Sequence, residues 1–183
     1  AELSEDDAGR LLNEALDLLE ARRQNATGAF ATDIETLVAA RGKLPKLVAR
    51  LAQAAPGSLQ TRIHGDFHFG QVLIAQSDTY IVDFEGEPRR SLAERRLKAP
   101  AARDVAGLIR SIDYSATAAF ERALLAGPDE HGRIAVGLEE WRVRSIATFL
   151  DAYRETLGDH DLWPKDRDAA DRLLDFFLLE KAF

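Results

Sequence analysis

The sequence contains no cysteine. This absence excludes a disulfide framework and a metal site built from thiolates. No apolar run approaches the ~20 residues that a membrane-spanning helix requires, and the acidic first residues, Ala1 to Asp7, do not resemble a signal peptide. The net charge of −7 disfavours nonspecific binding to nucleic acid or to an anionic membrane surface. These absences indicate a cytoplasmic protein with neither a nucleic acid nor a membrane as its partner.

The composition is that of an ordinary globular protein. The chain has 183 residues, 46% of them hydrophobic and 30% charged, which is enough for one domain with a hydrophobic core. Apolar residues at helical spacing occupy residues 1–60 and 103–183, whereas strand-like runs are confined to residues 61–88. The sequence therefore predicts a single domain over residues 1–183, mainly α with one small β-hairpin, which is an α+β fold.

Several helix boundaries can be placed from capping residues. Residues 4–7 and 32–35 each resemble a capping box, and Pro45 suits the first turn of a third helix. Asp104 begins the helix with the strongest apolar stripe. Two further helices are expected, at about 138–157 and at 166–180. Their apolar residues, Trp and Phe included, are expected in the core.

Residues 64–88 carry the polar side chains that point to a function. Asp66 follows a His-Gly turn, Gln71 comes five positions later, and Asp83 ends a second apolar run. Two apolar runs are expected to form a hairpin, with strands at 72–74 and 80–82 and a turn at 75–78. Because a hairpin brings its outer ends together, Gln71 and Asp83 would lie side by side, with Asp66 on the loop that leads in.

This order of side chains suits phosphoryl transfer from a nucleotide. A carboxylate must accept or orient the proton of the attacking hydroxyl, and two further oxygen ligands must hold the magnesium that bridges the phosphates. In kinases these groups are an Asp, an Asn five residues later and a second Asp after a hairpin. Here Asp66, Gln71 and Asp83 follow that order, with the amide oxygen of Gln in place of that of Asn.

The stretch resembles the catalytic segment of the aminoglycoside-phosphotransferase-like kinases, and within them the bacterial maltokinases, including those fused to trehalose synthase. The likeness rests on His-Gly-Asp-Phe-His-Phe-Gly-Gln-Val-Leu and Val-Asp-Phe-Glu-Gly-Glu-Pro, and it is dense over residues 61–116. It implies the C-terminal lobe of a protein-kinase-like fold, with Asp66 as catalytic base and Gln71 and Asp83 as magnesium ligands. It also implies Mg²⁺ as cofactor and transfer of the γ-phosphoryl group of ATP to the anomeric hydroxyl of maltose.

Five residues are candidates for supporting this site or for contacting substrate: His64, His68, Glu85, Arg103 and Asp104. Similar kinases brace the catalytic loop with an acid in the region of Asp104, so its carboxylate is expected to accept hydrogen bonds from the backbone around His64 and Gly65. The alternative is that Asp104 is only the first-turn acid of its helix.

Residues 89–102 occupy the place of a kinase activation segment and show neither helical nor strand period. Their basic side chains form either a solvated face or a rim that attracts phosphate and binds substrate hydroxyls.

A kinase also needs a lobe that clamps the nucleotide, with several strands, a phosphate-covering loop and a strand Lys paired with a helix Glu. Before Asp66 the sequence shows mainly helical patterns, and Lys43 and Lys46 lie beside a helix start instead of within an apolar strand. We therefore expect that the N-terminal lobe is absent, that the chain is a fragment of a longer enzyme, and that it is inactive alone.

Other functions stay open. The cluster His64-x-Asp66-x-His68 could belong to a metal-dependent hydrolase, or His64 could simply brace the loop while His68 supports the site or is exposed. A kinase-like module without catalysis is a second alternative. Within the kinases, choline, an aminoglycoside or another sugar could replace maltose as the acceptor.

Overall fold

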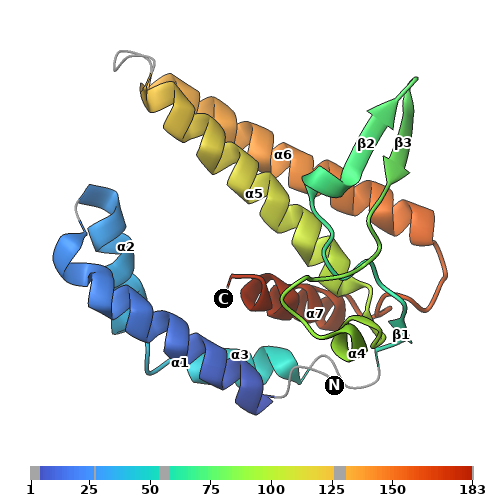
Figure 1. Ribbon diagram of the computed structural model, residues 1–183, viewed down its shortest axis with the longest axis horizontal. Helices are drawn as coiled ribbons and strands as arrows, with labels where there is room; N and C mark the ends of the chain where they lie inside the picture. The colour runs from blue at the N-terminus through green and yellow to red at the C-terminus, as the bar shows by residue number, and fades with distance from the viewer. Residues whose placement is uncertain (1–4, 27, 54–57, 126–130, 183) are drawn as a thin grey trace. The chain divides into compact units, whose positions relative to one another are not determined.

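The computed structural model describes residues 5–26, 28–53, 58–125 and 131–182. The chain forms two compact units, residues 1–58 with 164–183 and residues 59–163, and each unit is described by itself. Helices dominate, and the strands of the described residues form two antiparallel pairs, so the predicted mainly α fold is confirmed (Figure 1). The single domain over 1–183 stays a prediction. Among the described helices, none combines the length and apolar character that crossing a bilayer would require.

The first unit is built from helices: α1 Glu5–Arg22, the 3-10 helix η1 Arg23–Asn25, α2 Gly28–Ala39, α3 Leu44–Ala52 and α7 Arg167–Glu180. α1 packs against α2 and α3, and α3 packs against α7. Buried apolar residues one helical turn apart, such as Leu12 and Leu16 of α1, form the core. Pro45 lies in the first turn of α3, as predicted, where its missing N–H breaks no helical hydrogen bond.

The capping box expected at residues 32–35 is wrong. Thr32 lies inside α2, and its carbonyl oxygen accepts a hydrogen bond of 2.9 Å from Thr36 Oγ1. The reason is that α2 begins at Gly28, so the backbone is already helical when the chain reaches Thr32. The other predicted box includes Ser4, which lies outside the described residues. A real cap is found at Asp166, whose carboxylate accepts a hydrogen bond of 2.8 Å from Ala169 N at the start of α7.

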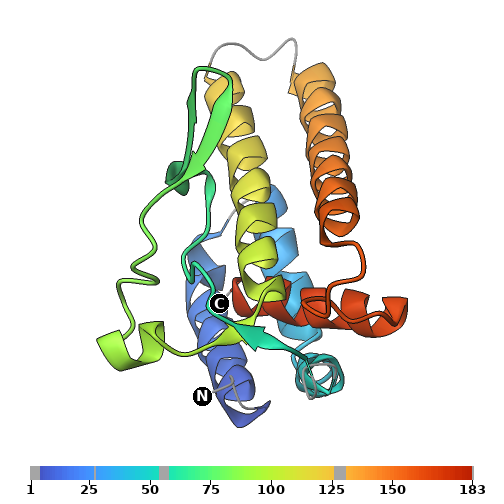
Figure 2. The same ribbon diagram turned by 90° about the vertical axis from the view of Figure 1, so that its right-hand side faces the viewer.

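The second unit carries all the candidate site residues. Its elements are β1 Gln60–Thr61, η2 Phe69–Gln71, β2 Val72–Ala75, β3 Asp78–Ile81, α4 Leu92–Arg95, β4 Ala99–Pro100, α5 Ala102–Leu124 and α6 His131–Leu157. β1 pairs with β4 and β2 pairs with β3, both antiparallel. α5 and α6 run side by side in opposite directions (Figures 1 and 2). The buried residues of α5 include Val105, Ile109 and Ile112 of the predicted stripe.

The predicted hairpin is present, with a tighter turn than expected. Val72 pairs with Ile81 and Ala75 with Asp78, so the loop between the strands consists of Gln76 and Ser77 alone. Both turn residues have positive φ angles, 52° and 67°. A two-residue turn of this hand matches the twist of the flanking strands, although glycine or asparagine is the usual residue there.

Two helices differ from their predictions. α4 lies within the stretch expected to be irregular, and it is stabilised by a capping box in which Ser91 and Glu94 bond each other's backbone N–H. α6 begins at His131, earlier than the expected position near 138, because packing against α5 outweighs the low helix propensity of its two glycines, Gly132 and Gly137. The described residues of α6 include none that is buried, so the expectation that its Trp and Phe lie in the core is wrong for this helix.

Candidate active site

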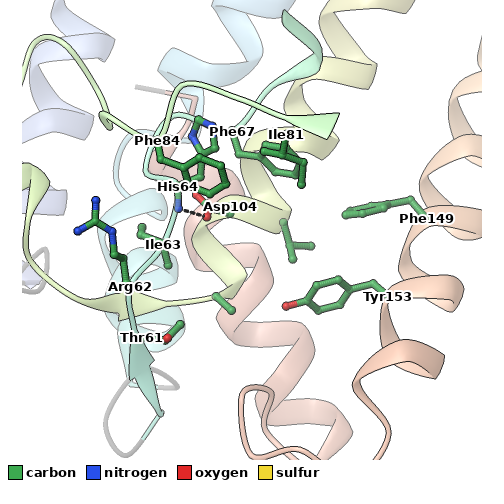
Figure 3. Close-up of a pocket in the computed structure, with 12 residues that line it drawn as sticks. Thr61, Arg62, Ile63, His64, Phe67, Ile81, Phe84, Asp104, Phe149 and Tyr153 are labelled. Atoms are coloured by element: carbon green, nitrogen blue, oxygen red, sulfur yellow. Dashed lines mark hydrogen bonds between the residues drawn. The ribbon is translucent and has the colours of Figure 1, made fainter. Parts of the chain in front are cut away.

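The loop that carries Asp66 is held in place by Asp104, which lies in the first turn of α5. The Asp104 carboxylate accepts hydrogen bonds from the backbone N–H groups of His64, at 2.6 Å, and Gly65, at 2.9 Å. The bond from His64 is the dashed line in Figure 3. Each carboxylate oxygen thus bonds one amide, as a charge-assisted pair. Asp104 therefore makes the contacts that were expected from the resemblance, and Arg103 lies next to it, half-buried.

His64 connects this loop to the end of the hairpin. Its side chain is buried, with 5% exposed, between the rings of Phe67 and Phe84 at centroid distances of 5.5 and 4.8 Å. Nε2 lies 2.8 Å from the carbonyl oxygen of Val82, and Nδ1 accepts a bond of 3.3 Å from Asp66 N. A carbonyl only accepts, so Nε2 carries the ring proton. His64 thus braces the loop, as expected.

The same contacts weaken the metal-hydrolase alternative. A histidine binds a metal through an unprotonated ring nitrogen, and neither nitrogen of His64 is available, because one bonds Val82 of the hairpin and the other bonds Asp66 of the loop. Asp66 Oδ2 and His68 Nε2 are 3.9 Å apart, which leaves two possible ligands. In the part of the chain that the structure describes, no three His, Asp or Glu side chains gather to hold a metal ion.

Gln71 and Asp83 lie side by side across the base of the hairpin. Gln71 Nε2 donates a hydrogen bond of 3.2 Å to Asp83 Oδ2, and Gln71 O accepts a backbone bond of 3.0 Å from Val82 N. η2, which contains Gln71, is anchored on α5 because Phe69 N donates to Ser111 Oγ at 3.0 Å. Because the Gln71 nitrogen makes this bond, the Gln71 amide oxygen remains as an oxygen donor in addition to the Asp83 carboxylate, and oxygen donors of this kind suit Mg²⁺.

Asp83 also has an unusual backbone. Its φ angle of 65° lies in the left-handed region, which a non-glycine residue adopts at a cost of order 1–3 kcal/mol. Asp tolerates this region better than most residues. The conformation turns the chain sharply after β3, and such outliers cluster at functional sites.

The loop before Asp66 and the loop after Asp83 meet through two glycines. Gly65 and Gly86 have φ angles of 85° and 80°, and a Cβ atom added to Gly65 would lie 3.2 Å from Gly86 Cα. A Cβ atom on Gly86 would meet the Arg95 side chain at 3.3 Å. Glycine at both positions lets the two backbones approach closely and sets the separation of the loops. Sequence patterns alone do not reveal this contact, because it joins segments 21 positions apart.

Within the described part of the chain, Glu85 makes no contact that would support the loop carrying Asp66. Its side chain is exposed, and the described residues include no hydrogen bond or ion pair between Glu85 and another candidate. The structure therefore gives it no supporting role in the loop, and contact with substrate stays a prediction.

A cavity of about 570 Å³ lies between the loop and α6. Phe67 and Phe84 face Phe149 and Tyr153 of α6 across it (Figure 3). Burial, with a smaller contribution from the negative charge of Asp104, raises the pKa of Tyr153. Asp66, Gln71 and Asp83 are not among the residues that line the cavity, so it is not where the predicted chemistry would occur.

Replacing Asp104 with Ala is expected to destabilise the loop. Two half-buried N–H groups would lose a charged acceptor, which lowers the free energy of unfolding by about 2–4 kcal/mol. Asp104→Asn keeps one acceptor oxygen, so its free energy of unfolding should lie between those of wild type and Asp104→Ala. Denaturant unfolding checks the magnitude, and hydrogen exchange at the His64 and Gly65 amides checks the location. Exposed Asp151→Ala on α6 is the control, and unchanged exchange at both amides in Asp104→Ala would contradict the bracing role.

Comparison with known proteins finds kinases among those that this chain resembles. No protein-family model matches the chain. It is 32% identical over 153 residues to a glucosamine kinase of Streptacidiphilus jiangxiensis and 30% identical over 150 residues to one of Mycolicibacterium smegmatis, covering 84% and 80% of this chain. The chain spans about a third of the length of these relatives, 32% and 31%.

Solved structures agree with the sequence relatives. The fold matches glucosamine kinase in complex with glucosamine, ADP and inorganic phosphate with a TM-score of 0.66 at 28% identity, over 96% of this chain and 41% of that one. Crystal form B of glucosamine kinase gives a TM-score of 0.65 over 96% of this chain and 40% of that chain. The maltokinase likeness and a trehalose synthase fusion stay predictions. Homologues of this chain are thus glucosamine kinases, and its fold corresponds to a part of theirs.

Proposed function

We propose that this chain is part of an ATP-dependent sugar kinase and carries its catalytic base and its magnesium ligands. The proposal rests on one arrangement: Asp66 lies on a loop that Asp104 braces, and His64 of this loop bonds Val82 at the end of the hairpin that holds Gln71 against Asp83. The homologues of the chain are glucosamine kinases. In this function Asp66 accepts the proton of the attacking sugar hydroxyl.

The residues of the chain act mainly by positioning. Asp104 and His64 hold the loop so that Asp66 stays at a fixed place, and the hairpin holds Gln71 against Asp83. Gln71 and Asp83 offer oxygen atoms on one side of this arrangement, where Mg²⁺ would be bound together with the phosphates. When bound, Mg²⁺ neutralises charge that develops on the phosphoryl group.

The nucleotide needs further contacts. The hairpin presents apolar side chains that are 47–78% exposed: Leu73, Ile74, Tyr80 and Ile81. In the proposed enzyme, a second lobe of the full-length protein and the base of ATP would cover this apolar surface. In the proposed enzyme, the clamping lobe lies outside these residues. This part of the proposal is supported by the described residues before Asp66, which form helices and one short strand.

An amino sugar such as glucosamine is the first candidate acceptor, because glucosamine is the ligand named for the homologous kinase. Maltose is the second, and the run Phe-Glu-Gly-Glu-Pro at residues 84–88 is what favours it. Phosphorus NMR of the full-length parent with ATP and Mg²⁺ tests both. Glucosamine, maltose, glucose, choline and an aminoglycoside form the panel, and the absence of a phosphorylated product with every sugar would overturn the proposal.

The chain of residues 1–183 alone is expected to be inactive. Phosphoryl transfer depends on positioning the nucleotide, and the chain offers only one side of that clamp. Asp66 and His68 are already 26% and 44% exposed, so water reaches the site freely. An ATP-consumption assay with the preferred sugar and Mg²⁺ checks this expectation. Sustained turnover near that of the full-length parent would show that the chain is a complete catalyst.

A further inference from the structure

His68 holds a fixed position beside Asp66 although it lies at the surface. Its side chain caps η2, because Gly70 N donates a hydrogen bond of 3.0 Å to His68 Nδ1. The fit is close: a Cβ atom on Gly70 would lie 2.7 Å from His68 Cε1 and 2.9 Å from Nδ1. The His68 imidazole can therefore occupy this position only because residue 70 has no side chain.

The bond from Gly70 determines the tautomer of the ring. Since the lone pair of Nδ1 accepts the Gly70 N–H, the proton of the neutral ring is on Nε2. The Nε2 atom lies 3.9 Å from Asp66 Oδ2. This distance is too long for a direct hydrogen bond between the two side chains.

The separation of the two atoms suits a single bridging oxygen. Such an oxygen would lie at ordinary hydrogen-bond lengths, about 2.9 Å from Nε2 and about 2.7 Å from Oδ2. Because these two atoms are 3.9 Å apart, the angle Nε2···O···Oδ2 at the bridging oxygen would be roughly 90°. A hydroxyl can meet both at once, because it donates its proton to the carboxylate and accepts from the imidazole N–H.

We propose that His68 is a further catalytic residue, whose Nε2–H donates a hydrogen bond to the acceptor hydroxyl that Asp66 deprotonates. The proposal rests on the proposed kinase function and adds the group that holds the nucleophile. The hydroxyl oxygen forms a bond to the γ-phosphorus of ATP, the bond from that phosphorus to the bridging oxygen breaks, and ADP leaves. The hydroxyl proton passes to Asp66, and His68 stays neutral throughout.

The arrangement also selects the kind of nucleophile. An imidazole N–H needs a lone pair on its partner, which a hydroxyl has and a protonated amine lacks. If the acceptor is an amino sugar, its ammonium group therefore lies outside the Asp66–His68 pair, and the product is a phosphate ester.

Two substitutions separate hydrogen-bond donation from capping. His68→Asn keeps an oxygen near the position of Nδ1, where it can cap η2, but it has no donor near the position of Nε2. His68→Gln places an amide N–H near Nε2 and loses the cap. In the full-length parent, His68→Asn is expected to lower kcat roughly 10- to 100-fold, with a smaller change in KM, while His68→Gln retains most of the activity.

Gly70→Ala provides an independent variant, because its methyl group displaces the ring while His68 remains in place. Its kcat should fall as in His68→Asn, and Gly137→Ala, which has nothing within 4 Å of the new Cβ atom, is the matched control. Full activity in His68→Asn with loss in His68→Gln would show that His68 is a cap alone and overturn the proposal. Unchanged activity in all His68 and Gly70 variants would overturn it too. A wild-type parent that phosphorylates no sugar would instead overturn the proposed function itself, and this proposal with it.

Discussion

Replacing Asp66 with Asn in the full-length parent is expected to lower kcat by ~100- to 10,000-fold, the usual contribution of general-base assistance. Asn has the shape of Asp but cannot accept the hydroxyl proton. The fold should be preserved, because the loop is fixed through the backbone N–H groups of His64, Gly65 and Asp66 instead of through the Asp66 carboxylate. Steady-state kinetics with ATP and the preferred sugar measure the loss.

The control for this prediction is Asp78→Asn, which makes the same change of charge at an exposed position of the hairpin. It should leave kcat within a few-fold of wild type, since the charge of an exposed side chain is largely screened at physiological ionic strength. Circular dichroism should be the same for wild type and both variants. If Asp66→Asn turned over at a near-normal rate, Asp66 would have no part in proton transfer.

The local geometry of the site could be predicted from the sequence. The positions of Gln71 and Asp83 follow from two apolar runs separated by a turn, because a hairpin has to bring its outer ends together. The tightness of the turn could not be predicted, since Gln76 and Ser77 are not the residues that usually adopt positive φ angles. α4 carried a readable signal, the Ser91-x-x-Glu94 capping box, which the basic side chains around it obscured.

Contacts between distant segments were beyond sequence patterns. The bonds from Asp104 to the loop span 39 and 40 positions and were expected only through the resemblance to kinases. The Gly65–Gly86 approach depends on how two loops fold against each other. The position of the His68 ring relative to Asp66 depends on the conformation of their own loop, which periodicity does not give. Periodicity gives the apolar face of a helix, but it does not show whether a neighbouring element covers that face. For this reason the prediction that the Trp and Phe of α6 are buried is wrong.

The charge of Asp83 is expected to be indispensable for activity. Asp83→Ala removes the anionic ligand of the proposed magnesium site, and metal stabilisation of a transferring phosphoryl group is worth several kcal/mol, so kcat/KM should fall by at least ~1,000-fold. Ala also tolerates the left-handed backbone of this residue poorly. Asp83→Asn keeps that tolerance and the size of the side chain while removing the charge, so it separates the two effects.

Gln71→Ala is the companion to these variants. Gln71 is a neutral ligand, so its loss should raise the Mg²⁺ concentration at half-maximal rate by roughly 10-fold and leave the rate at saturating Mg²⁺ within several-fold of wild type. Asp83→Asn should remain inactive at every Mg²⁺ concentration. Magnesium titrations of the full-length parent at fixed ATP make the comparison. If the Gln71→Ala curve superimposed on that of wild type, Gln71 would not be a ligand, and its hydrogen bond to Asp83 would be its whole contribution.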